Sequence, residues 1–163
     1  MNENTTANAY LRTKVMTASP EELRLMLLDG ALKFANQARV GLEKQHPEMI
    51  YEGFTQCRDI ILELTNTIKT DPAPEIAKAV RELYTYMYGE LVKASIEKDI
   101  ATLDAVIGLL EYERETWVLT MDQLARERES EMLNSAAQSA PHTSPPAPSS
   151  TSGMAHHPIS FQA

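Results

Sequence analysis

The sequence predicts an all-α protein: an antiparallel up-down-up-down four-helix bundle with a short N-terminal helical arm and a disordered C-terminal tail. Apolar residues recur every three or four positions through most of the chain, which is the helical period. Short proline-containing breaks divide this pattern into four long segments, and short connections make neighbouring helices antiparallel. The expected divisions are an arm over 1–18, a bundle over 19–130 and a tail over 131–163.

The N-terminal segment lies outside the first long helix. Residues 8–17 are expected to form a short helix, because Leu11 and Val15 are four positions apart and can share a face. A helix of this length is marginal in water by itself, so it must dock on another surface or fray. We therefore expect a movable arm, with Tyr10 and Leu11 as its candidate contact residues.

The first long helix is predicted from Pro20 to about Lys44. The Ser-Pro-Glu-Glu motif at 19–22 is a capping box with proline at the first helical position. Gly30 costs the helix about 1 kcal/mol relative to alanine. It is either a tolerated weak spot or a place where another backbone approaches closely. The inner stripe of this helix consists of Leu23, Leu27, Ala31, Phe34, Ala38 and Leu42.

The second helix is predicted from Pro47 to about Lys69. Its apolar residues step by four and three without a miss, which is a heptad seam typical of left-handed helical bundles. Cys57 lies on this seam and is expected to be a small core residue rather than a reactive thiol. As the single cysteine of the chain, it excludes an internal disulfide and fits a reducing cytosol. The seam consists of Ile50, Phe54, Cys57, Ile61, Leu64 and Ile68.

The third helix has two possible starts, one with Asp71 as the cap and one with Pro74 in the first turn, and it ends at about Lys98. Its inner stripe is expected to consist of Ile76, Val80, Leu83, Met87, Leu91 and Ala94.

The fourth helix is predicted to follow a cap at Asp99 and to end at about Glu129. Arg114 interrupts its apolar seam, so this side chain either pairs with a carboxylate inside the bundle or extends outward along its stem. The complete seam consists of Leu103, Ile107, Leu110, Arg114, Trp117, Met121 and Leu124.

The last segment, residues 131–163, has the composition of a disordered tail. It contains seven serines, five prolines and six alanines, with no lysine or arginine. Such a segment cannot bury enough apolar surface to offset the loss of conformational entropy. Three of the four histidines, His142, His156 and His157, lie there, and we expect them to be solvated rather than to bind a metal.

The charge and hydropathy of the chain exclude several classes of partner. The formal net charge of −8 argues against nucleic acid and against anionic membranes. No run approaches the roughly 20 apolar residues of a membrane span, so no membrane insertion is expected. The N-terminus has neither the basic nor the apolar region of a signal peptide. These features predict a cytosolic protein.

No motif for catalysis, a metal or a cofactor is visible. A di-iron bundle needs inward-facing Glu-x-x-His motifs, and a phosphotransfer bundle needs a histidine within a helix. His46, at a helix break, is the only histidine outside the tail. The chain also has no Walker loop, no Gly-x-Ser-x-Gly motif and no Cys/His zinc spacing. We therefore expect a non-enzymatic protein without metal or cofactor.

The third helix carries more apolar surface than a bundle position needs. Tyr84, Tyr86 and Tyr88 widen its inner stripe to about 200°, beyond the roughly 100° that a core-facing helix uses. Tyrosine has an apolar ring and a polar tip, which suits a surface that is covered only part of the time. One interpretation is a groove for an amphipathic helix, which the arm covers when no client is bound. The other is that the tyrosines flank the core and direct their hydroxyls to water.

Three stretches resemble the FliS family of flagellar export chaperones. Residues 8–34, NAYLRTKVMTASPEELRLMLLDGALKF, resemble the opening of that family. Residues 83–88, LYTYMY, look like its L-Y-x-Y-M segment. Gly108-Leu109-Leu110, followed by Arg114 and Trp117, look like its G-L-L and R-x-x-W segment. The resemblance extends over about residues 8–122. Leu28 stands where the family usually has an aromatic residue, and Gly89 and Glu90 stand where many members are basic.

The resemblance implies a cytosolic export chaperone that binds the C-terminal region of flagellin. Such a chaperone prevents premature polymerisation and keeps its client competent for flagellar type III export. Tyr84, Met87, Tyr88 and Leu91 would then line the client groove. Tyr10 and Leu11 would lie on the movable arm and help to present the complex to a second partner, the cytosolic domain of the export gate.

The alternative function is a non-enzymatic homodimeric helical-bundle scaffold or adaptor. In that case the surplus apolar stripe of the third helix would be a self-association face.

Overall fold

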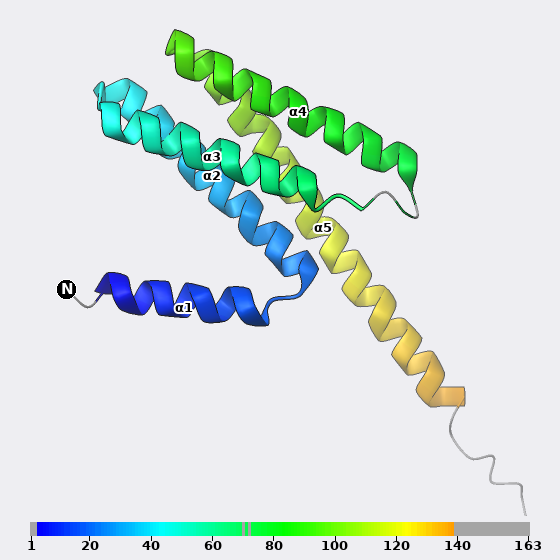
Figure 1. Cartoon of the computed structure of the whole chain (residues 1–163). Coiled ribbons are helices and arrows are strands. Elements are labelled where there is room, and N and C mark those ends of the chain that lie inside the picture. Colours follow the sequence, from blue (N-terminus) through cyan, green and yellow to red (C-terminus); the bar gives the residue numbers. More distant parts are fainter. Residues whose placement is uncertain (1–2, 70, 72, 139–163) are drawn as a thin grey trace, which may run out of the picture. The chain divides into compact units, whose positions relative to one another are not determined.

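The computed structural model describes residues 3–69, 71 and 73–138 of the 163-residue chain, and these residues form five α-helices and no strand (Figure 1). The predicted all-helical class is therefore confirmed. The helices are α1 (Glu3–Thr17), α2 (Pro20–Lys44), α3 (Pro47–Asn66), α4 (Pro74–Glu97) and α5 (Ile100–Gln138).

The chain divides into two compact units, Met1–Glu127 and Arg128–Ala163. In the second unit the described residues, 128–138, are helical and have exposed side chains. The predicted tail begins at residue 131, but the helix continues to Gln138. The rest of that tail, including its three histidines, lies outside the described residues. No helix in the described part of the chain is both long and apolar enough to span a membrane.

The start of α2 follows the predicted capping box. The Glu22 backbone N–H donates to the Ser19 hydroxyl at 3.2 Å, and the Ser19 N–H donates to the Glu22 carboxylate at 2.8 Å. Each of these hydrogen bonds gives a partner to a backbone N–H group that the start of the helix would otherwise leave unpaired. Pro20 occupies the first helical position, so α1 and α2 are separate helices.

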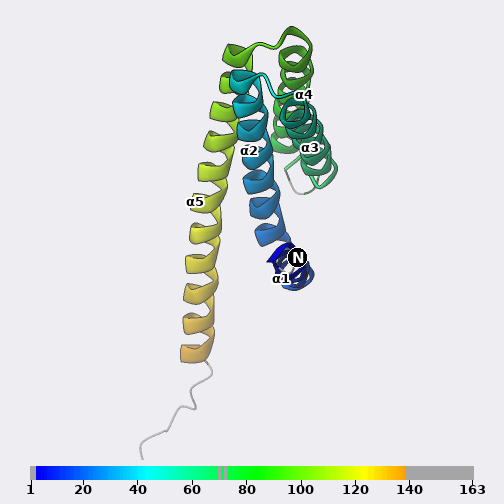
Figure 2. The same cartoon turned by 90° about the vertical axis from the view of Figure 1, so that its left-hand side faces the viewer.

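Helices α2 and α3 lie side by side and pack very closely (Figures 1 and 2). A Cβ atom at Gly53 would lie 2.5 Å from the backbone nitrogen of Ala38 and 2.7 Å from the carbonyl oxygen of Phe34. Gly30, by contrast, faces the side chain of Ile60, to which its Cβ would come within 3.2 Å. The close backbone approach considered for Gly30 therefore occurs at Gly53 instead.

One hydrophobic core draws buried residues from α2, α3, α4 and α5. Cys57 is fully buried in it, as predicted. Burial raises the pKa of its thiol to about 12. The buried members from α2 and α3 are Leu28, Ala31, Ala35, Ala38, Phe54, Cys57, Ile61 and Leu64. Those from α4 and α5 are Tyr84, Met87, Leu91, Ala94, Leu103, Val106, Ile107 and Leu110.

The core-facing stripe of α4 differs from the predicted one at its N-terminal half. Ala77 and Tyr84 are buried there, whereas Ile76 is 67% exposed and Leu83 is only partly buried. The predicted stripe took the aliphatic residues as inner ones. The structure instead buries the aromatic ring of Tyr84, because its hydroxyl finds polar partners on two other helices.

Helix α5 contacts α2 through polar pairs as well as through the core, and Figure 2 shows the two helices alongside each other. Asp99 caps α5 as predicted, since its carboxylate accepts from the Ala101 N–H at 3.0 Å. Arg114 pairs with Asp29 of α2, and both side chains are about half exposed. Arg114 therefore pairs with a carboxylate, as one of the two alternatives expected, but at the surface and not inside the bundle.

Candidate functional site

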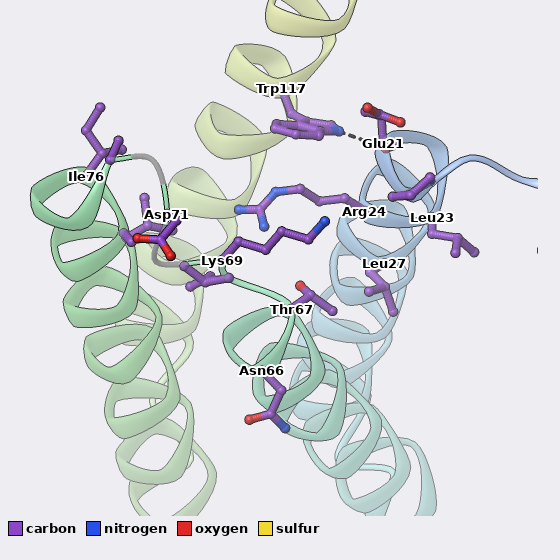
Figure 3. Close-up of a pocket in the computed structure, with 15 residues that line it drawn as sticks. Glu21, Leu23, Arg24, Leu27, Asn66, Thr67, Lys69, Asp71, Ile76 and Trp117 are labelled. Carbon is purple, nitrogen blue, oxygen red and sulfur yellow. Dashed lines mark hydrogen bonds between the residues drawn. The ribbon is translucent and has the colours of Figure 1, made fainter.

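An apolar groove of about 730 Å³ lies where the start of α2 faces the end of α3 and the start of α4 (Figure 3). Trp117 of α5 forms one of its walls. Its apolar lining comprises Leu23, Leu27, Ile68, Ile76, Ala77, Val80 and Trp117. Ile76 is largely exposed, so the groove presents aliphatic side chains to whatever enters it.

Two cationic side chains, those of Arg24 and Lys69, extend into this groove in Figure 3. The guanidinium carbon of Arg24 lies 4.9 Å from the centroid of the Trp117 ring and 5.6 Å from that of the Tyr84 ring. Cation–π contacts of this kind hold the flat arginine head between aromatic faces. The indole N–H of Trp117 donates to the carbonyl oxygen of Glu21 at 2.9 Å, which fixes the ring against α2.

Tyr84 supports the groove from the core side. Its hydroxyl accepts a hydrogen bond from Arg24 at 2.6 Å and donates one to the Glu113 carboxylate at 3.2 Å. Burial raises the pKa of the Tyr84 hydroxyl above its usual value, while the nearby Arg24 cation acts in the opposite direction. The hydroxyl therefore stays protonated and joins α2, α4 and α5 at one point.

The four residues predicted to line a client groove are not all accessible. Tyr84, Met87 and Leu91 are fully buried in the core, and Tyr88 is partly buried. The surface position inferred for Tyr84 was wrong, because its hydroxyl is satisfied inside the protein by Arg24 and Glu113. Whether these four residues contribute to client binding stays a prediction.

The described side chains of the N-terminal arm lie outside the groove lining. The described side chains of α1, from residue 6 to 17, are exposed, and none of them lines the groove. Tyr10 is 67% and Leu11 50% exposed. Both side chains are thus available for a contact, and their predicted role at an export gate stays a prediction.

Sequence reasoning missed the groove because its residues belong to three separated stretches. Leu23 and Leu27 were assigned to the inner stripe of α2, and Ile76 to that of α4. Within the described residues, no cluster of three or more His, Cys, Asp or Glu side chains could hold a metal ion.

Comparisons with known proteins identify relatives of this chain. Residues 2–124 match the model of the family described as flagellar protein FliS. The flagellar secretion chaperone FliS of Bacillus subtilis is 33% identical over 120 residues, which cover 74% of this chain and 89% of that relative. The protein of the same name from Salmonella typhimurium is 33% identical over 112 residues, covering 68% of this chain and 83% of the relative. That of Campylobacter jejuni is 28% identical over 117 residues, covering 72% and 91%.

Proposed function

Because the chain belongs to the FliS family, whose named relatives are flagellar secretion chaperones, we propose that it binds the C-terminal region of flagellin in the cytosol. Binding would prevent premature polymerisation and keep the client competent for export. The mechanism would be stoichiometric binding without chemistry, so the chain would not be an enzyme.

We further propose that α2 to α5 form an antiparallel up-down-up-down four-helix bundle. The breaks between successive helices are short, which favours antiparallel neighbours. All four helices contribute to one hydrophobic core, as a bundle requires. In this arrangement the arm would be residues 1–18 and the chaperone domain residues 19–130.

The observation that carries the proposed function is the apolar groove beside Trp117. Grooves of this kind bind the apolar face of an amphipathic helix, with anchor residues spaced by three or four positions. Leu23 and Leu27 are four positions apart on α2, and Ile76 and Val80 are four apart on α4, so the groove has apolar side chains on both sides at helical spacing. A client helix laid between them would cover Ile76, which is otherwise mostly exposed.

The predicted client residues on α4 have distinct roles in this proposal. Tyr88, which is partly accessible, would contact the client directly. Tyr84, Met87 and Leu91 would support the binding surface from within the core. Tyr84 would do so through Arg24, which it holds beside Trp117.

The arm would act at the next stage of export. Tyr10 and Leu11 are exposed apolar residues on a helix with no buried side. We propose that they present the loaded chaperone to the cytosolic domain of the export gate. The arm would be free to move because the capping box at Ser19 ends its continuity with α2.

The test is a calorimetric titration of a flagellin C-terminal peptide into three forms of the full chain. Ile76→Asp places a charge in the groove at an exposed position, where the fold should tolerate it. Ile96→Asp is the matched control, because Ile96 is 74% exposed on the same helix and does not line the groove. We expect Ile76→Asp to weaken binding by about tenfold or more, as loss of a central anchor does, and Ile96→Asp to leave the affinity unchanged.

Equal affinities of the wild type and both variants would contradict the assignment of the groove. Light scattering on the free and peptide-bound chain addresses the alternative function. A stable dimer that ignores the peptide would identify a self-associating scaffold instead of a chaperone.

A further inference from the structure

We propose a second binding site, independent of the groove, for a peptide segment in which an acidic residue lies beside an aromatic or branched aliphatic residue. The site is a hollow of about 250 Å³ between the first turns of α3 and the last turn of α4, which we call the basic hollow. Its lining comes from Pro47, Ile50, Tyr51, Phe54, Arg58 and Lys98, together with two small polar residues.

The floor and rim of the basic hollow are apolar. Phe54 is almost completely buried beneath it, and Ile50 is partly buried. Tyr51, at its edge, is 74% exposed and presents most of its ring to solvent. An exposed tyrosine beside an apolar floor is a composition that recurs in protein interfaces, because the ring contributes both apolar area and a hydroxyl group.

The charged side chains of the basic hollow are both cations, although the protein carries a net charge of −8. Arg58, which lines the hollow, donates from Nε to the carbonyl oxygen of Phe54 at 3.3 Å. Neither Arg58 nor Lys98 has an ion-pair partner among the described residues. The groove and three further surface hollows each include at least one carboxylate in their lining, but this one does not.

This arrangement selects the chemistry of the partner. A carboxylate would be attracted by both cations, and arginine can bind it through two parallel hydrogen bonds. An adjacent aromatic or branched aliphatic side chain would cover the apolar floor formed by Ile50 and Phe54. A basic or purely polar segment would leave both features unsatisfied, so charge complementarity gives the site its specificity.

The basic hollow lies far from the groove along the same two helices. It uses the beginning of α3 and the end of α4, whereas the groove uses the end of α3 and the beginning of α4. From Ile50 to Asn66 the rise of 1.5 Å per residue gives roughly 24 Å. A segment bound at the basic hollow would therefore leave the groove open.

The test is a selection from a random peptide library on the full-length chain, with counter-selection on the double variant Arg58→Gln/Lys98→Gln. Nitrogen-15 NMR of the full chain then locates the bound peptides. The matched control is Arg12→Gln/Lys78→Gln, which changes the net charge equally at exposed positions outside the hollow. Thermal unfolding of each variant checks that the fold is retained.

The expected peptides carry an acidic residue within two positions of an aromatic or branched aliphatic one. They should shift amide signals between Ile50 and Arg58 and near Lys98. The Arg58→Gln/Lys98→Gln variant should bind them about tenfold more weakly, as loss of a charge-assisted contact does, and the control variant should bind them normally. A selection that enriches no peptide, peptides without an acidic residue, or binding that the double variant retains would overturn the proposal. None of these results bears on flagellin binding in the groove.

Discussion

Tyr84 has two polar partners in a core that is otherwise apolar. Its hydroxyl joins Arg24 of α2 to Glu113 of α5, while its ring is fully buried between them. A buried hydroxyl without partners would cost the fold free energy, so the pairing explains how a tyrosine can occupy this position. It also places the guanidinium group of Arg24 beside Trp117, in the wall of the groove.

Removal of the Tyr84 hydroxyl should therefore lower the stability of the whole chain. Tyr84→Phe keeps the ring and deletes both hydrogen bonds, so we expect a loss of about 1 kcal/mol in the free energy of unfolding. Tyr86→Phe is the matched control, because Tyr86 is two positions further along the same helix and is 56% exposed. Urea unfolding of both variants provides the measurement. An unchanged midpoint for Tyr84→Phe would show that the hydrogen bonds contribute nothing.

The buried thiol of Cys57 predicts a dependence of stability on alkaline pH. Its pKa is raised to about 12 in the folded chain, because burial disfavours the thiolate. The unfolded chain loses this proton near the ordinary pKa of about 8.5 to 9, so the thiol's contribution is fully present below that pH and decreases as the pH rises toward 12.

The thiol should therefore make unfolding easier above pH 9. We expect Cys57→Ala to be less stable than the wild type at pH 8, because it leaves a small cavity. Its free energy of unfolding should nevertheless fall less steeply from pH 9 to pH 11. Urea titrations at several pH values in this range provide the measurement. An equal decrease of the free energy of unfolding with pH in the wild type and in Cys57→Ala would contradict the raised pKa of the thiol.

At the scale of helices, the contact between α2 and α3 depends on the absence of a side chain at Gly53. A Cβ atom there would overlap backbone atoms of Ala38 and Phe34. The buried residues of α2 include three alanines, Ala31, Ala35 and Ala38, and it is the backbone of Ala38 that Gly53 approaches. The two helices thus pack backbone to backbone where larger residues would hold them apart.

Gly53→Ala should consequently destabilise the protein, although alanine is the better helix former. Relief of the overlap requires the backbones to separate, and overpacking of this kind typically costs about 1–3 kcal/mol. Gly108→Ala is the control, since a Cβ atom there has nothing within 4 Å. We expect it to stabilise α5 by up to about 1 kcal/mol. Thermal unfolding of both variants would test this, and changes of the same sign would contradict it.

The sequence predicted the starts of α2, α3 and α5 correctly, because the signals for them are local, whereas the predicted ends of α3 at Lys69 and of α5 at Glu129 differ from the observed ones. The motif at Ser19, the proline at position 47 and the cap at Asp99 each act on backbone groups a few residues away. The orientation of α4 about its axis was not predictable in this way. Burial of Tyr84 instead of Leu83 depends on Arg24 and Glu113, which lie far from it in sequence.

The candidate sites were harder to predict, because they too depend on residues that lie far apart in the sequence. Helical spacing indicated surplus apolar surface at the tyrosines of α4, but the largely exposed apolar residue of α4 that lines the groove is Ile76, near the start of the helix. The groove is completed by Leu23 from α2 and Trp117 from α5. The resemblance at the level of motifs indicated the family, and the family match over residues 2–124 confirmed it.

At the scale of the whole molecule, the described surface has two hollows whose linings differ in chemistry. The groove beside Trp117 is larger and mainly apolar, with cations and carboxylates in its lining, and suits an amphipathic helix. The basic hollow is smaller and has cations as its charged groups. We propose that the first site holds the client and that the second can accept another segment at the same time.

The proposed function depends on binding of flagellin through its C-terminal region. The most direct test is a calorimetric titration of the full chain with intact flagellin monomer and with flagellin that lacks its C-terminal region. We predict one-to-one binding of the intact client and no measurable binding of the truncated one. Equal affinities for the two forms of flagellin would contradict the proposed function.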